Sequence, residues 1–83
     1  MPKFRFVFHE ETEREEVTDI ELRDHEEALA EARRAALETI IDEVLEGNDP
    51  TRWVVRVYND TEQLIGTIFF VDLLSSAPNP PGL

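Results

Sequence analysis

The strongest constraint on the fold is one long helix-forming segment in the middle of the 83-residue chain. It reads RDHEEALAEARRAALETIIDEVLEGNDP and is filled with Ala, Leu, Glu and Arg, which favour the helical state. Asp24 can cap its N-terminus, and Glu27, three residues later, completes a capping-box pattern. Gly47, with Pro50 close behind, is a typical helix end. The sequence therefore predicts a single long helix between Asp24 and Gly47.

The residues before the helix predict an antiparallel hairpin. Lys3–His9 alternates polar and apolar side chains, with Phe at positions 4, 6 and 8, which is typical of a strand with one buried face. The acidic run EETEREE that follows contains no apolar residue, so we expect it to be an exposed connection. Val17–Leu22 alternates over a shorter stretch and predicts a strand at the edge of the sheet.

The residues after the helix predict a second hairpin. RWVVRVYND and QLIGTIFFVD predict two strands joined by a turn at Asn59, Asp60 and Thr61. The order β-β-α-β-β predicts an α+β fold, a two-layer sandwich with an antiparallel four-stranded sheet and one helix on one face. We expect a single domain over residues 1–74 and a flexible Pro-rich tail over residues 75–83.

The charge of the chain narrows the choice of partners. The formal net charge is −11, from 19 acidic against 8 basic residues, and the basic residues are scattered along the sequence. Nucleic acid and anionic membranes should therefore repel the protein. The phenylalanines of the first strand lack the basic groove of a nucleic-acid stacking platform, so we interpret them as a buried strand face. Without cysteine or a membrane-length apolar run, we expect a cytoplasmic protein without disulfides.

The predicted elements carry more apolar surface than one helix and one sheet face can bury together. The apolar arc of the helix is wider than the stripe that seats a helix on a sheet. The third and fourth strands have apolar residues on both sides, yet a single helix covers only one. Monomers rarely leave large apolar patches exposed, so we expect a homodimer. The expected dimer contacts are Leu37, Ile41, Val54, Tyr58, Ile65 and Phe69.

Acidic side chains gather along one side of the predicted helix. Near the helix C-terminus the macrodipole disfavours their negative charge, and each such residue destabilises the helix by roughly 0.3–1 kcal/mol at low salt. One interpretation is a solvated face that keeps a small protein soluble. The other is a docking surface for a basic protein partner. This acidic ridge consists of Glu31, Glu38, Asp42 and Glu46.

Four segments of the chain carry a family resemblance: MPKFRFVF, DIELRDHEEALAEARRAALE, WVVRVYND and FFVD. They resemble a family of short uncharacterised bacterial proteins, mostly from soil and plant-associated alphaproteobacteria, that is catalogued as a domain of unknown function. Members of this family have an M-P-x-aromatic-x-F start, E-L-x-D before an Ala-rich helix, and an F-x-D ending, and the four segments here are similar to these motifs. Family members usually have a glycine in each hairpin, whereas EETEREEV and NDTEQL here have none. The resemblance implies the same architecture and no assigned activity.

Few residues in the chain suggest catalysis or metal binding. His9 and His25 are the only histidines and do not fall in a known metal-ligand spacing. Asp60, Glu62 and Asp72 are carboxylates that could gather at one end of the sheet. Neither a nucleophile triad nor a Gly-rich phosphate loop occurs. We therefore expect no catalytic residue, no metal and no cofactor.

Two functional hypotheses follow from the sequence. The first is a small, non-catalytic protein-interaction or regulatory module that acts as a homodimer. The second is a small-ligand-binding or enzymatic domain with a pocket between the Ala-rich helix and the aromatic sheet. The first is favoured, because the predicted inward positions supply no polar groups to such a pocket.

Overall fold

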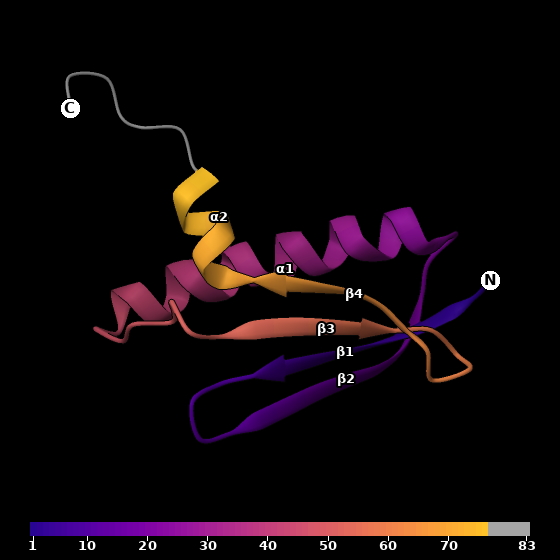
Figure 1. Ribbon diagram of the computed structural model, residues 1–83, viewed down its shortest axis with the longest axis horizontal. Coiled ribbons are helices and arrows are strands. Elements are labelled where there is room, and N and C mark those ends of the chain that lie inside the picture. The colour runs from indigo at the N-terminus through magenta and orange to yellow at the C-terminus, as the bar shows by residue number, and fades with distance from the viewer. Residues whose placement is uncertain (77–83) are drawn as a thin grey trace.

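The computed structural model describes residues 1–76, with side chains to residue 74 (Figure 1). Four strands form one antiparallel sheet in the order β2-β1-β3-β4, and a long helix lies on one face of it (Figure 1). The predicted fold class is confirmed. The elements are β1 (Lys3–His9), β2 (Arg14–Glu21), α1 (His25–Leu45), β3 (Val54–Tyr58), β4 (Leu64–Phe69) and α2 (Phe70–Ser76).

The ends of α1 follow the local signals in the sequence. The Asp24 side chain accepts a hydrogen bond from the Glu27 backbone N–H at 2.8 Å, as predicted for the N-cap. The Glu27 carboxylate turns back toward Arg23 and accepts from its backbone N–H at 3.4 Å. At the other end Gly47 adopts φ 86°, and the Asn48 N–H reaches the Glu43 carbonyl at 2.8 Å. This is a Schellman C-cap, which needs glycine at the left-handed position.

The core lies between α1 and the sheet. Ala28, Ala32 and Ala36 are fully buried, so the backbone of α1 can approach the strands closely. The prediction that the first strand buries its aromatic side is confirmed for Phe4 and Phe6, and Phe6 is 3% exposed. Phe8 is partly buried against the same cluster. The aromatic row is therefore a packing surface, as its alternation predicted.

The acidic connection of the first hairpin is shorter than predicted. Only Glu10–Glu13 forms the turn, closed by a hydrogen bond from the Glu10 N–H to the Glu13 carbonyl at 2.9 Å. The remainder of EETEREE belongs to β2, because Arg14 and Arg5 place positive charge beside Glu16 and offset the repulsion among the acids. The prediction that β2 is an edge strand is confirmed.

The predicted fourth strand ends early. β4 stops at Phe69, and Phe70 begins α2, a helix that the sequence did not suggest. Phe70 is fully buried, donates its N–H to the Trp53 carbonyl at 3.1 Å and packs on the Trp53 ring at 6.0 Å. The chain therefore turns to cover the end of the core, and Leu73 is buried with it. The predicted tail begins inside this helix, and its residues 77–83 lie outside the described residues.

Candidate interaction surfaces

The sheet face turned away from α1, here called the open face, carries charged side chains. They alternate with the core residues along each strand. The predicted faces of β3 are confirmed, with Val54 and Tyr58 here and Val55 and Val57 in the core, but Arg56 lies between the two apolar residues of the open face. Two rows cross its middle, Arg14-His9-Val54-Phe69 and Glu16-Val7-Arg56-Thr67.

An ion-pair network occupies the β1–β2 side of the open face. Arg5 Nη1 donates to Glu16 Oε1 at 2.7 Å, and Arg14 Nη2 donates to the same oxygen at 2.5 Å. Arg5 Nη2 also reaches Glu62 at 2.5 Å, and its guanidinium lies 4.4 Å from the centre of the Tyr58 ring. The hydrogen bond from Arg14, with a further contribution from Arg5, holds the pKa of Glu16 below its usual range. Both carboxylates in this network therefore already have arginine partners.

The β3 side of the open face has a positive group that is not compensated. Arg56 is exposed and has no ion pair with any residue in 1–76. Its neighbour His9 is half-buried, and its Nε2 atom has no hydrogen-bond partner. Burial lowers the pKa of His9, and the positive charges of Arg56 and Arg14 lower it further. His9 is therefore neutral near pH 7, and Arg56 is the free charge of this region.

Apolar side chains border the free arginine. Phe69, at the β4 edge of the first row, is 49% exposed, and Leu64 on the same strand is also exposed. Val54 lies between Phe69 and His9 and is half-buried. The open face thus combines a cation with accessible apolar surface.

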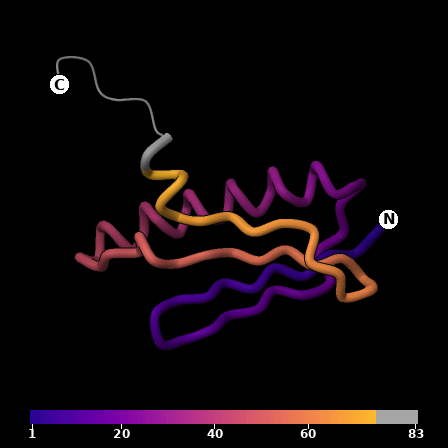
Figure 2. The backbone as a smooth tube through the Cα atoms, in the orientation of Figure 1, coloured from indigo at the N-terminus to yellow at the C-terminus, as the bar shows by residue number. Residues whose placement is uncertain are grey.

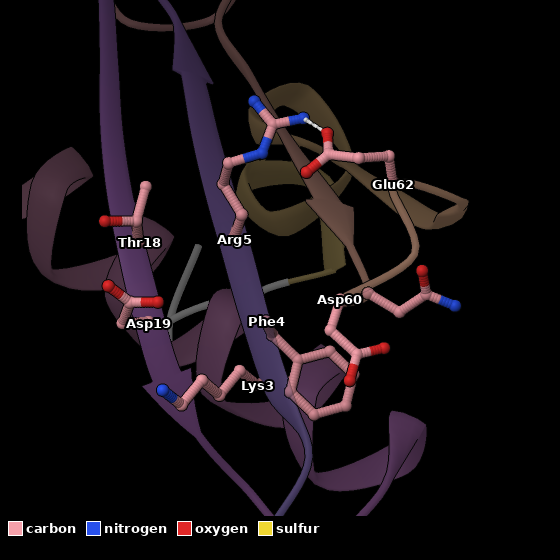
Figure 3. Close-up of a pocket in the computed structure, with 8 residues that line it drawn as sticks. Lys3, Phe4, Arg5, Thr18, Asp19, Asp60 and Glu62 are labelled. Atoms are coloured by element: carbon pink, nitrogen blue, oxygen red, sulfur yellow. Dashed lines mark hydrogen bonds and ion pairs between the residues drawn. The ribbon is translucent and has the colours of Figure 1, made fainter.

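Figure 3 shows a hollow at the end of the sheet where β1 begins. Its volume is about 270 Å³, and the Arg5–Glu62 ion pair forms part of its wall. The lining groups carry both signs of charge, so they define no single kind of ligand. The lining residues are Lys3, Phe4, Arg5, Thr18, Asp19, Asn59, Asp60 and Glu62.

The histidines and carboxylates that the sequence singled out do not meet. His25 packs edge-on against Phe4 at 5.9 Å, near the start of β1, whereas His9 ends that strand. A strand of this length separates them by roughly 16 Å, too far to share one metal ion. Asp60 and Glu62 lie in the turn before β4, but Asp72 lies in α2 beyond its other end. Within residues 1–76, His, Asp and Glu side chains form no cluster that could hold a metal ion.

The outer side of α1 carries an apolar row. Leu37, Ile41 and Leu45 follow each other at four-residue spacing and are exposed, Ile41 by 59% and Leu45 by 81%. Val44, one turn beyond the buried Ile40, is exposed as well. We call Leu37, Ile41, Val44 and Leu45 the α1 apolar stripe. Short helix α2 packs on α1 (Figure 1) and adds exposed apolar side chains of its own, Val71 and Leu74.

The acidic ridge is interrupted by an arginine. Arg34 pairs with Glu31 and donates to Glu38 at 2.5 Å, so two of the four predicted ridge residues already have an arginine partner within the helix. The Arg34 hydrogen bond keeps the pKa of Glu31 below its usual range. Asp42 and Glu46 are exposed near the helix C-terminus, and the last turn has no basic residue. The negative end of α1 therefore keeps its excess charge.

The residues predicted to form the dimer contact lie on two opposite sides of the molecule. Leu37 and Ile41 belong to the α1 apolar stripe. Val54 and Phe69 lie on the open face beside each other, and Tyr58 lies there under Arg5. The sixth residue, Ile65, is half-buried and packs against the core. The predicted dimer contacts thus come from both layers of the sandwich.

The interior between α1 and the sheet is filled by side chains. The three alanines of α1 meet Val55, Val57 and Phe70, all fully buried. Gly66 on β4 approaches α1 so closely that a Cβ there would lie 2.5 Å from Leu29 Cδ2. Among the described residues, no polar or charged side chain is buried in this core. The structure thus offers no support for a pocket between helix and sheet.

The sequence alone missed Arg56 as a candidate site residue. The signal was present, because Arg56 interrupts the valines of its strand as Arg5 and His9 interrupt the phenylalanines of theirs. What the strands could not show separately was the register that brings these positions onto one face.

The protein is thus a small two-layer α+β domain with an open sheet face and an apolar helix stripe. The chain belongs to the family described as Domain of unknown function (DUF6894), whose model matches residues 3–71. Neither a curated protein nor a solved structure matches the chain. Within residues 1–76, no helix is both long and apolar enough to cross a membrane.

Proposed function

We propose that this protein is a non-catalytic protein-interaction module that acts as a homodimer through the α1 apolar stripe. The observation that carries the proposal is the stripe itself, four large aliphatic side chains exposed along one side of α1. Such a continuous apolar row on a small protein is typical of an interface. The filled core supports a role in binding rather than catalysis.

The charges beside the stripe make it self-complementary. Arg33 and Arg34 lie in the N-terminal half of α1, and Asp42 and Glu46 lie in the C-terminal half. An antiparallel pairing of two α1 helices with its two-fold axis level with Thr39 would bring the arginines of each helix to the height of the acidic end of the other copy. Arg33 has no ion pair within the described chain and is available for this contact.

The antiparallel arrangement also removes an electrostatic conflict. Asp42 and Glu46 lie at the negative end of the helix macrodipole, which disfavours them. A partner's arginine at that end would offset both the carboxylates and the last helical carbonyls. A second copy thus supplies the positive charge for which the sequence suggested a basic protein partner. With Glu31 and Glu38 already held by Arg34, little of the ridge is left for another basic protein.

Sedimentation velocity at micromolar concentration tests the dimer. The wild-type protein should have about twice the 9.6 kDa chain mass. Ile41→Glu places a charge in the centre of the stripe and should give a monomer, because burying an unpaired carboxylate is costly. Leu64→Glu is the matched control, since Leu64 is similarly exposed but lies on the open face, and it should remain a dimer.

A wild-type monomer at these concentrations would reject the proposed function. A dimer that Leu64→Glu dissociates and Ile41→Glu leaves intact would move the interface to the open face.

A further inference from the structure

The middle of the open face has a charge opposite to that of the whole molecule. The chain has a net charge of −11, yet the middle of this face holds Arg5, Arg14 and Arg56 against Glu16, with Glu62 at its end. In the two central rows the acid is Glu16, which two arginines bind, and Glu62 at the end is bound by Arg5; Glu21, opposite Lys3 near the start of β1, has no arginine partner among the described residues. An incoming carboxylate therefore meets an unpaired guanidinium and no free acid in the central rows.

We propose that this face is a docking surface for an acidic protein segment that also carries apolar side chains. Arg56 binds a carboxylate of the segment, and Phe69 and Val54 contact the apolar residues of the segment. This inference goes beyond the proposed dimer, because the α1 apolar stripe lies on the other side of the sandwich. A dimer formed through α1 leaves both open faces turned outward.

The charge of Arg56 is complementary to an acidic partner at short range. Its basic neighbours do not compete with it for an incoming carboxylate, since Arg14 is already paired with Glu16 and His9 is neutral. At physiological salt, charges interact over about 8 Å, so the acidic outer side of α1 on the opposite layer is largely screened. The guanidinium group binds carboxylates in a bidentate geometry that lysine cannot offer.

The apolar surface beside Arg56 determines the second requirement for the partner. Phe69 lies across from Val54, one row from Arg56. It is half exposed and does not belong to the core cluster of the described residues. Aromatic side chains next to an arginine are typical of binding hot spots. A purely acidic segment would leave this apolar surface in water, so acids alternating with apolar residues fit better.

Fluorescence anisotropy with three labelled peptides of equal length tests the proposal. One alternates Glu and Asp with Leu and Phe, the second replaces its acids by Lys and Arg, and the third replaces its apolar residues by Ser. The first should bind the full-length protein most tightly, and its affinity should fall as salt is raised.

Two variants with the same charge change identify the site. Arg56→Glu should weaken binding of the first peptide at least about tenfold. Arg23→Glu is the control, because Arg23 is exposed in the connection before α1 and pairs only with Glu27; it should change the affinity less than about twofold. The monomeric Ile41→Glu variant should bind with wild-type affinity per chain, so failure of the dimer and failure of the docking surface are distinguishable.

Three results would overturn the proposal. The first is equal or tighter binding of the basic peptide. The second is an equal loss of affinity in Arg56→Glu and Arg23→Glu, which would mean that only net charge matters. The third is a lower mass for Arg56→Glu in sedimentation without peptide, which would show that a second copy occupies the open face.

Discussion

The two hairpins of this protein have the same antiparallel design and very different environments. α1 packs directly on β3 and β4, and Val55, Val57 and Ile68 are buried beneath it. β2 lies at the opposite edge of the sheet (Figure 2), and its side chains are exposed along almost its whole length. The second hairpin and β1 form the core, while β2 is held by backbone pairing and by the Arg5–Glu16–Arg14 network.

The difference shows that strand pairing and burial are separate contributions to stability. Phe6 and Val17 are cross-strand neighbours on the same sheet face, yet Phe6 is 3% exposed and Val17 is 45% exposed. One strand further from the centre of the sheet is enough to lose the cover of the helix. Surface ion pairs, which each contribute roughly 0–1 kcal/mol, cannot replace the buried area that β2 lacks.

The sharpest test of this comparison replaces the two neighbours in turn. Phe6→Ala should lower the free energy of unfolding by roughly 3–5 kcal/mol, because it removes a buried aromatic ring from a small core. Val17→Ala should cost less than about 1 kcal/mol, since its side chain is already half in water. Urea denaturation followed by circular dichroism measures both. Equal losses for the two variants would mean that α1 covers the first hairpin as well.

A smaller effect is expected where the second hairpin meets the helix. Gly66→Ala should destabilise the protein by about 1 kcal/mol, because the new methyl group meets the end of the Leu29 side chain. In the Leu29→Ala background the added cost should disappear, since the atom in contact is gone. A double-mutant cycle by thermal unfolding gives both values. A Gly66→Ala penalty of the same size in both backgrounds would place its origin in the strand backbone instead.

The smallest predicted effect concerns the turn of the first hairpin and depends on pH. Burial raises the pKa of Glu10, and the negative charges of Glu13, Glu15 and Glu43 raise it further. A carboxyl with a raised pKa in the folded state favours folding below its unfolded pKa, and this contribution is lost as pH rises through the folded value. Glu10→Gln should therefore raise the melting temperature slightly at pH 7.

The gain from Glu10→Gln should vanish at about pH 3, where the carboxyl is protonated in both states. Differential scanning calorimetry at the two pH values measures the change, and the His9 contribution cancels because both proteins contain it. A gain that is the same at both pH values would exclude charge repulsion as its cause.

The sequence predicted best where the structure is local. The N-cap at Asp24 and the C-terminal glycine at Gly47 depend on residues within one helical turn, and both were predicted correctly. The buried side of β1 followed from alternation alone. The start of α2 did not, because Phe70 and Val71 continue a strand-like apolar run. The Trp53 ring and backbone, distant along the chain, hold Phe70 in its buried place together with the core side chains around it.

The candidate surfaces divide in the same way. The apolar residues of the α1 stripe could be read from helical spacing, and so could the acidic ridge, because an isolated helix already fixes which side chains share a side. The open face could not, since it depends on the register of four strands and on which face α1 covers. Local sequence patterns were enough to predict the four strands, α1 with its caps, and the net charge of −11. The ion pairs of Arg34 with Glu31 and Glu38 are also local, at i,i+3 and i,i+4 spacing. That Arg56 stands unpaired beside Phe69 depends on tertiary structure, because cross-strand pairing brings together residues that no local pattern links.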